Sequence, residues 1–377
     1  MRSFLLLLLA WPLLAAAQAY PSKPVRLVVP YPPGGGLDLF ARPLAQKVTE
    51  LVGQPVVVEN KPGASGVVGA AHVAQQPADG YTLLLAPAAQ YLQPFVSKNV
   101  PFDNARDFTP VISAVNYHNV IVVHPELPIR SVKELVDYAR SNPSKLAYVT
   151  AGQNSSQHLA ALLLTHMTGA ELLHVSYKGG NPALNDLLGG RVQMGILVQS
   201  TVMPHIKSGK LRPIAVVEGD RAKALPEVPT VAQGGLEGYA IPESWLGILG
   251  PGGLPKEVVS RFNQAANKAI ADPELRARVE SLGYELTGST PEQFQQQIDR
   301  TVVLYRRIVT NAGIKPEWNS LPMSRQKDRL SAPSSATTSS TCPRTSQACS
   351  PSSTAATLRS RLPKEKSRTV RRGLWRA

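Results

Sequence analysis

Short apolar runs alternate with longer amphipathic stretches through most of this chain. The apolar runs lie at residues 25–29, 56–58, 81–86, 120–123, 146–150, 172–175, 194–198 and 214–217. Between them, apolar positions recur at helical spacing, as in 37–52 and 131–141. Buried strands that alternate with helices are typical of an α/β fold, and we expect mainly parallel sheets.

The last third of the chain has helical patterns without matching strands. An extended stretch at 241–249 is followed by helical patterns at 256–271, 273–282 and 291–312. Helices without strands of their own pack most readily on a sheet that already exists. We therefore expect two lobes joined by crossings near 115–122 and 238–246. The predicted boundaries are 20–118 and 242–317 for lobe 1, and 119–241 for lobe 2.

The N-terminal residues are typical of a secretory signal. One positive charge at Arg2 precedes an apolar run that begins at Phe4, and Ala17 and Ala19 are small residues at the positions that signal peptidase reads. The run is shorter than the roughly 20 residues that a membrane-spanning helix needs. We therefore expect a signal peptide at 1–19, cleavage after Ala19 and a periplasmic location.

The formal net charge of +14 is concentrated at the C-terminus. Residues 318–377 contain 12 Lys and Arg against 2 Asp and Glu, whereas residues 20–317 contain 27 against 24. A nearly balanced body gives no electrostatic footprint for nucleic acid, so we expect no such partner. The tail is rich in Ser, Thr and Pro, which predicts disorder. A shifted reading frame or read-through would produce such a tail, and the same tail in frame in close relatives would contradict that hypothesis.

A glycine-rich loop follows the first apolar run and leads into a helix. Gly34, Gly35 and Gly36 precede Asp38 in this loop. N–H groups at a helix start have no partner within the helix, and the helix dipole favours an anion there. The glycines do not follow G-x-G-x-x-G or the P-loop pattern, so we do not expect a nucleotide. The alternative is that they only serve a tight turn.

The second lobe repeats this construction. The run at 146–150 leads into Ser155 and Ser156 and then a helix, and residues 177–180 follow the next run. Serine hydroxyls at a helix start can cap it or bind a ligand. With His158, they leave open an exported α/β hydrolase or isomerase, although no G-x-S-x-G elbow occurs. Because ligands of open α/β sheets bind beyond the carboxyl ends of the strands, these loops predict a cleft between the lobes.

The sequence offers no metal site. Its seven histidines are scattered, it has no H-E-x-x-H motif, and its two cysteines, Cys342 and Cys349, both lie in the tail. We therefore expect neither a metal nor another cofactor.

Eight segments together form a specific pattern. They are residues 20–24, 29–38, 58–66, 79–85, 155–159, 177–180, 204–212 and 225–230. This pattern resembles the Bug family of extracytoplasmic solute receptors, the binding components of tripartite tricarboxylate transporters. The resemblance covers about residues 20–317 and implies a two-lobe, periplasmic-binding-protein-like (Venus flytrap) α/β fold that closes on a small carboxylate. It also implies a monomer that is not an enzyme, with the transporter's membrane subunits or a sensor protein as partners.

The loops that match the family's motifs are expected to face the ligand. The expected ligand-binding residues are Tyr31, Pro33, Gly34, Gly35, Asp38, Ala88, Gln90, Ser155, Ser156, Gln157, His158, Tyr177, Gly179, Gly180 and Gln199. Where family members often carry acidic residues that discriminate ligands, this chain has Gln193, Gly195, Gln199 and Ser200. The resemblance therefore does not imply a ligand with an amino group.

Overall fold

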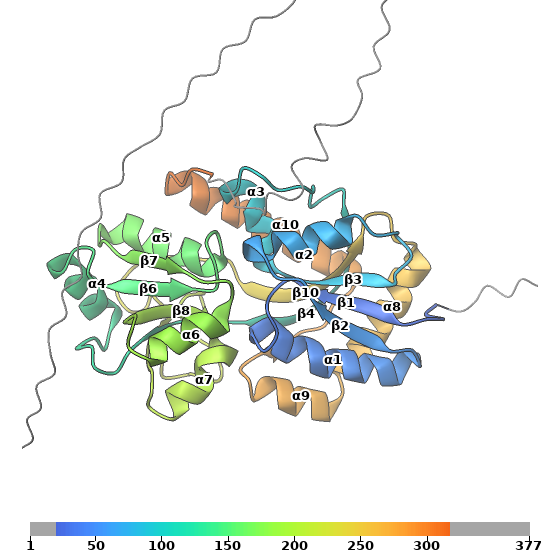
Figure 1. The fold of residues 1–377 in the computed structure, drawn as a ribbon, viewed down its shortest axis with the longest axis horizontal. Helices are drawn as coiled ribbons and strands as arrows, with labels where there is room; N and C mark the ends of the chain where they lie inside the picture. The colour runs from blue at the N-terminus through green and yellow to red at the C-terminus, as the bar shows by residue number, and fades with distance from the viewer. Residues whose placement is uncertain (1–19, 317–377) are drawn as a thin grey trace, which may run out of the picture. The chain divides into compact units, whose positions relative to one another are not determined.

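Two β-sheets organise the fold, each with helices on both faces (Figure 1). The computed structural model describes residues 20–316, so the predicted signal peptide and tail lie outside the described residues. The first sheet has the order β11-β4-β10-β3-β1-β2, with strands Glu285–Leu286, Phe108–Tyr117, Ser244–Pro251, Thr82–Pro87, Val25–Val29 and Val56–Asn60. The second has the order β7-β6-β8-β5-β9, with strands Leu173–Ser176, Ala147–Thr150, Met194–Val198, Asn119–Val123 and Arg212–Val216.

The helices divide between the two sheets. Those that accompany the first sheet are α1 (Gly36–Val52), η1 (Ala64–Gly66), α2 (Val67–Ala74), η2 (Ala88–Leu92), α3 (Gln93–Val96), α8 (Lys256–Ile270), α9 (Pro273–Glu280) and α10 (Pro291–Asn311). Those that accompany the second are α4 (Val132–Ser141), α5 (Ser156–Thr168), α6 (Gly180–Leu188) and α7 (Gln199–Lys207). We call the first sheet with its helices lobe 1 and the second sheet with its helices lobe 2.

Strand β1 illustrates why both faces need helices. Leu27 and Val29 pack into one apolar cluster with α1 and α8, whereas Val28 packs into another with α2 and α10. Successive side chains of a strand point to opposite faces, so the consecutive apolar residues Leu27, Val28 and Val29 require cover on both sides. The continuous apolar runs in the sequence reflect this double burial.

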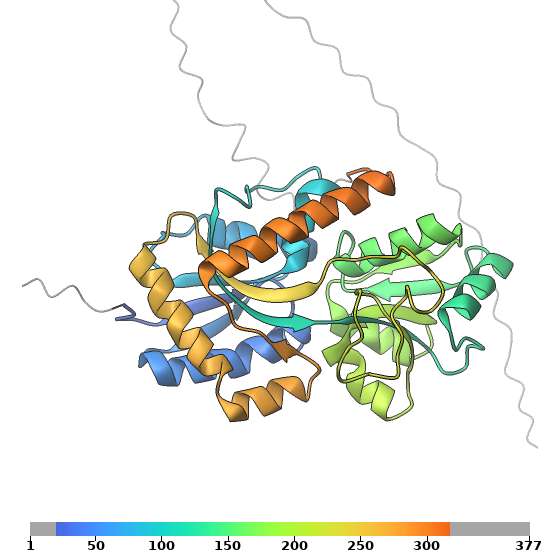
Figure 2. The same cartoon turned by 180° about the vertical axis from the view of Figure 1, so that it is seen from behind.

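Both sheets are mixed, so the prediction of mainly parallel sheets is wrong. Strands β1 to β3 pair in parallel, as do β6 to β8, but β10 and β4 are antiparallel neighbours, and β5 runs antiparallel to β8 and β9. The reason is the pair of crossings: β4 leads into β5, and β10 returns the chain in the opposite direction (Figure 2). An apolar run does not record strand direction. The sequence analysis also missed most of β4, since its polar Ser113 and Asn116 interrupt the apolar pattern.

A buried carboxyl joins the two crossings. Glu218 follows β9, Asn119 begins β5 and Ser244 begins β10. The Glu218 carboxyl accepts hydrogen bonds from Asn119 N at 2.9 Å, Asn119 Nδ2 at 2.8 Å and Ser244 Oγ at 2.8 Å. Burial raises the pKa of Glu218, although nearby His118 and these hydrogen bonds act to lower it. A buried carboxyl is costly unless its hydrogen bonds are made, so this cluster fixes the strands where they pass between the lobes.

Helix α10 packs against both lobes (Figure 2). Its N-terminal Thr290 forms a capping box with Gln293, and Thr301 accepts a 3.0 Å hydrogen bond from the buried indole of Trp245 on β10. Near its C-terminal end, Tyr305 and Ile308 pack into the apolar cluster of lobe 2. The helix therefore braces the side of the molecule on which the chain crosses.

We expect Gly247→Ala to destabilise lobe 1. A Cβ at this position in β10 would lie 2.1 Å from Phe294 Cζ, and the fully buried phenylalanine ring has no free space to move into. Overpacking of this kind costs about 1–3 kcal/mol, which denaturant unfolding would measure. Gly219→Ala is the matched control, because a Cβ there meets nothing within 4 Å and the backbone lies outside the left-handed region. That control should keep or slightly raise the unfolding free energy. Equal stability of the two variants would contradict the packing argument.

Candidate ligand-binding cleft

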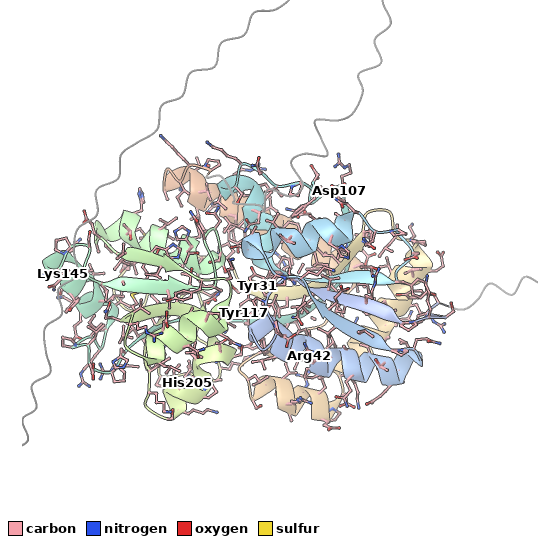
Figure 3. All side chains as sticks on the ribbon, in the orientation of Figure 1. Tyr31, Arg42, Asp107, Tyr117, Lys145 and His205 are labelled. Atoms are coloured by element: carbon pink, nitrogen blue, oxygen red, sulfur yellow. The ribbon has the colours of Figure 1, made fainter. Side chains whose placement is uncertain are left out.

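A cleft lies between the lobes and encloses about 600 Å³, its open mouth included. Its lining comes from both lobes: Tyr31, Pro32, Pro33, Gly35, Gly36, Leu37, Pro87, Ala89, Tyr117, Ala151, Ser156, Gln157, Gly180, Asn181, Leu197, Val198 and Thr201. Six of these were expected from the sequence, namely Tyr31, Pro33, Gly35, Ser156, Gln157 and Gly180. In Figure 3, the labelled Tyr31 and Tyr117 lie where the two lobes meet.

Five helical segments begin at this cleft. They are α1, η2, α5, α6 and α7, and each contributes a cap or first-turn residue to the lining. The N–H groups of a first turn have no partner within their own helix, and the aligned peptide dipoles place partial positive charge there. None of the lining side chains among residues 20–316 is charged. The positive character of the cleft therefore comes from the backbone.

Asp38 and Gly34 hold the glycine-rich loop before α1 in shape, and neither lines the cleft. The buried Asp38 carboxylate accepts hydrogen bonds from Gly34 N and Asn60 Nδ2, both at 2.9 Å, and from Arg42 Nε at 2.8 Å. Burial alone would raise the pKa of Asp38, but these three donors outweigh it and hold the pKa below its usual value. Asp38 is thus a fixed anion that positions the loop. Gly34 has a left-handed φ of 74°, and a Cβ there would lie 3.0 Å from Asn181 Nδ2 of lobe 2.

Ser155 and His158 support the first loop of lobe 2 in a similar way. Ser155 Oγ caps α5 by accepting from His158 N and donates to Gly152 O at 2.7 Å. His158 Nδ1 accepts from Asn154 N at 3.1 Å, and its ring stacks on His174 with centroids 4.1 Å apart. Burial lowers the pKa of His158 to about 4. Both side chains are occupied within the loop, whereas Ser156 lines the cleft and its hydroxyl has no hydrogen-bond partner among residues 20–316.

The other expected residues lie beside the cleft rather than in its lining. Tyr177 O–H donates to Asp186, and Gly179 packs against Pro32 across the lobes. Gln90 donates to Asn104 Oδ1 at 3.0 Å, while its neighbour Ala89, rather than Ala88, reaches the cleft. Gln199 is buried against Gly283, and neither of its side-chain polar atoms is hydrogen-bonded within the described part of the chain.

Tyr117 is the most informative residue that the sequence analysis missed. It ends β4 at the first crossing and is buried, yet its hydroxyl makes no hydrogen bond within residues 20–316. Burial raises the pKa of Tyr117 well above its ordinary value, so the phenol keeps its proton. The only signal in the sequence is its position at the predicted crossing, which was interpreted as a boundary and not as part of the site.

Polar contacts join the lobes on both sides of the cleft. On one side, Tyr284 of lobe 1 donates its hydroxyl hydrogen to Gly36 O within the same lobe, and its oxygen lies 2.9 Å from Ser200 Oγ of lobe 2. Because the single phenolic hydrogen is used on Gly36, the Ser200 hydroxyl must be the donor to Tyr284. On the other side, Gln93 Nε2 donates to Asn154 O at 2.9 Å. The structure is therefore a closed arrangement of the two lobes.

Two negative findings concern the described residues only. No helix within 20–316 is long and apolar enough to cross a membrane. The same residues contain no group of three or more His, Cys, Asp or Glu side chains placed to hold a metal ion.

Comparison with known proteins identifies a consistent group of relatives. Residues 40–314 match the family described as tripartite tricarboxylate transporter family receptor. The chain is 40% identical over 275 residues to a UPF0065 protein from the tcbD–tcbE intergenic region of Pseudomonas sp., covering 73% of this chain and 82% of the relative. It is 33% identical over 302 residues to protein BugT of Bordetella pertussis, covering 80% and 92%.

Solved structures agree with these relatives. The periplasmic binding protein BugD is similar with a TM-score of 0.75 and 34% identity, over 79% of this chain and 100% of that one. A protein of R. palustris solved with adipate also has a TM-score of 0.75 and 34% identity, over 79% of this chain and 100% of that one. MatC from Rhodopseudomonas palustris with bound malate has a TM-score of 0.73 and 26% identity, over 77% and 100%. These neighbours confirm the two-lobe, periplasmic-binding-protein-like α/β fold.

We expect His158 to make the protein less stable in acid. Its pKa of about 4 lies below the ordinary 6.5, so the unfolded chain binds the proton more readily. The neutral, buried His158 therefore contributes to the free energy of unfolding. That contribution is complete above pH 6.5 and is lost as the pH falls toward 4, by up to about 3 kcal/mol. In urea unfolding from pH 7.5 to 4, His158→Asn should lose less stability than the wild type, since asparagine can still accept from Asn154 N. His166→Asn on the exposed side of α5 is the control. Parallel pH profiles for wild type and His158→Asn would refute the expectation.

Proposed function

Because this chain belongs to the tripartite tricarboxylate transporter receptor family, we propose that it is a periplasmic receptor that captures a small carboxylate between its lobes. The observation that carries the proposal is the convergence of five helical N-termini on a cleft whose lining, within residues 20–316, has no charged side chain. Such a surface suits an anion held by hydrogen bonds. It does not provide a cationic side chain as a counter-ion.

The ligands of two structural relatives support the same chemical class. One neighbour was solved with adipate and another with malate. Both compounds are small dicarboxylates, and the cleft of this chain offers helix starts in each lobe. A dicarboxylate could therefore place one carboxylate at α1 of lobe 1 and the other at α5 or α6 of lobe 2.

The proposed contacts divide the expected residues by role. Gly35, Gly180 and Ser156 offer N–H or hydroxyl donors to the ligand, and Tyr31 and Pro33 form apolar walls. A second set, which acts by positioning the loops, comprises Gly34, Asp38, Ser155, His158, Tyr177 and Gly179. Ala88, Gln90 and Gln199 belong to the segments that surround the cleft and complete this proposed site.

Capture is coupled to closure by contacts that only the closed state makes. A ligand held first by one lobe adds partners when the other lobe arrives, so it favours the closed state by that difference in affinity. The hydrogen bond from Ser200 of lobe 2 to Tyr284 of lobe 1 contributes to the same state. The closed form is what membrane subunits of a tripartite transporter, or a sensor, would recognise, and the signal peptide at 1–19 would deliver the receptor to them as a monomer.

The family consists of solute-binding receptors, so this protein is a receptor rather than an enzyme. The geometry explains why Ser155 and His158 do not form a nucleophile and base. Ser155 Oγ donates to Gly152 O, and His158 Nδ1 is used by Asn154 N. Membership of a receptor family thus leaves no support for an exported hydrolase or isomerase that uses Ser155, Ser156 and His158.

We expect dicarboxylates to stabilise the protein against heat. A ligand at 100 times its Kd adds about 2.7 kcal/mol to the unfolding free energy, which should raise the Tm by several degrees. Differential scanning calorimetry with adipate, malate, succinate and citrate would measure this, with the corresponding diamines as a control for non-specific effects. No rise with any acid, in protein freed of co-purified ligand, would refute the proposal.

We expect Ser156→Ala to weaken carboxylate binding by about three- to tenfold, as for loss of one hydrogen bond. The Ser156 hydroxyl lines the cleft and has no other partner within residues 20–316, so its removal should leave the fold intact. Titration calorimetry with the acid that gives the largest thermal shift would report the Kd. Ser260→Ala, on the exposed face of α8, should bind like the wild type. Equal Kd values for both variants would exclude Ser156 from the site.

A further inference from the structure

Gln157 connects the cleft to the buried cluster at the crossings. Its side chain lines the cleft and is only 5% exposed. Gln157 Nε2 donates to Asn119 Oδ1 at 2.8 Å, and Asn119 is the residue that donates to Glu218 and Ser244. A continuous chain of hydrogen bonds therefore runs from the ligand-facing surface to the buried Glu218 at the crossings.

The directions of these hydrogen bonds are fixed by the number of available hydrogens. The two hydrogens of Asn119 Nδ2 go to Glu218 Oε1 at 2.8 Å and Ser244 Oγ at 3.0 Å. The single hydroxyl hydrogen of Ser244 goes to the same Glu218 oxygen at 2.8 Å. With its NH₂ group committed to Glu218 and Ser244, the Asn119 amide can present only its oxygen to Gln157. Gln157 must therefore use its NH₂ group on Asn119.

This arrangement leaves one polar atom of the Gln157 side chain without a hydrogen-bond partner within residues 20–316. Its Oε1 receives no hydrogen bond from any residue in 20–316, and it is not among the fully enclosed unpartnered atoms. Since Gln157 lines the cleft, this oxygen is an acceptor available to a ligand. The amide cannot turn over to present a donor without placing its oxygen against Asn119 Oδ1.

From this geometry we infer that Gln157 is a specificity-determining residue whose fixed carbonyl oxygen selects a hydroxycarboxylate over the same acid without a hydroxyl group. The inference rests on the proposed carboxylate-binding function and refines its ligand class. On closure, an unsubstituted acid leaves the Gln157 oxygen buried without a donor, which is the costly case for a polar group. A hydroxyl group on the ligand supplies that donor.

A hydroxyl fits this cleft better than an ammonium group. An ammonium group would need an anionic partner when it is desolvated. The cleft lining within residues 20–316 has no Asp or Glu, and five helical N-termini already make the local potential positive. A neutral O–H donor meets the Gln157 oxygen without that electrostatic cost.

The test compares acids that differ by one hydroxyl group. Kd values of the intact wild-type protein are measured by titration calorimetry for succinate against malate and for glutarate against 2-hydroxyglutarate. We expect the hydroxylated member of the better-bound pair to bind about tenfold more tightly. Gln157→Met keeps the side-chain volume but removes the acceptor, and should reduce the preference to within about twofold. Gln295→Met, on the exposed face of α10, is the control and should keep it.

Asn119→Ala tests the orientation of the amide separately. Without Asn119 Oδ1, the Gln157 amide can turn over, and the preference for the hydroxylated acid should fall although Gln157 is still present. If acids bind to the wild type but the two members of each pair bind within about twofold, for example because a water satisfies the oxygen, the inference is wrong and the proposed function stands. A tenfold preference that survives Gln157→Met also overturns it. If no acid binds, the proposed function itself fails.

Discussion

The arrangement of the cleft depends on the direction of three parallel strands in each lobe. Strands β1 to β3 and β6 to β8 all end toward the boundary between the lobes, and a helical segment begins after each of them. Strand direction thus determines where the first-turn N–H groups lie. Because those groups must be paired with something when they are buried, the closed cleft requires either water or a ligand rich in acceptors.

This dependence explains which parts of the site could be predicted from the sequence. An apolar run, a glycine or serine loop and a helical pattern occur together along the chain, so the loops at Gly35, Ser156 and Gly180 were found by their local order. The same local signal also selected Asp38 and His158, whose side chains turn away from the cleft to hold the loops in place. A loop can be predicted from its neighbours in sequence. The direction of a side chain within it is set by partners such as Arg42 that the pattern does not reveal.

The buried hydrogen-bond cluster at the crossings was the least predictable part of the fold, although the approximate positions of the crossings were expected. Asn119, Glu218 and Ser244 are brought together from three separate segments, and the separation between Asn119 and Ser244 is 125 residues. None of them belongs to a motif. Their importance arises from burial and from mutual hydrogen bonding, which exist only after both sheets have formed. A single sequence contains no periodic or local signal for such a cluster.

The two flanks of the cleft differ in what holds them together. On the side of α10, Leu92, Tyr305 and Ile308 of lobe 1 share an apolar cluster with lobe 2. On the side of α1, Val198 is the one buried residue of lobe 2, within 20–316, that joins the apolar cluster of lobe 1. Separating apolar surfaces exposes them to water, while the hydrogen bond between Ser200 and Tyr284 can be exchanged for bonds to water at little net cost. The lobes should therefore stay in contact along α10 and separate on the side of α1. A departing solute would then leave past α1 and α7. The lifetime of the bound state would then be set by the weaker, polar edge and not by the strong apolar one.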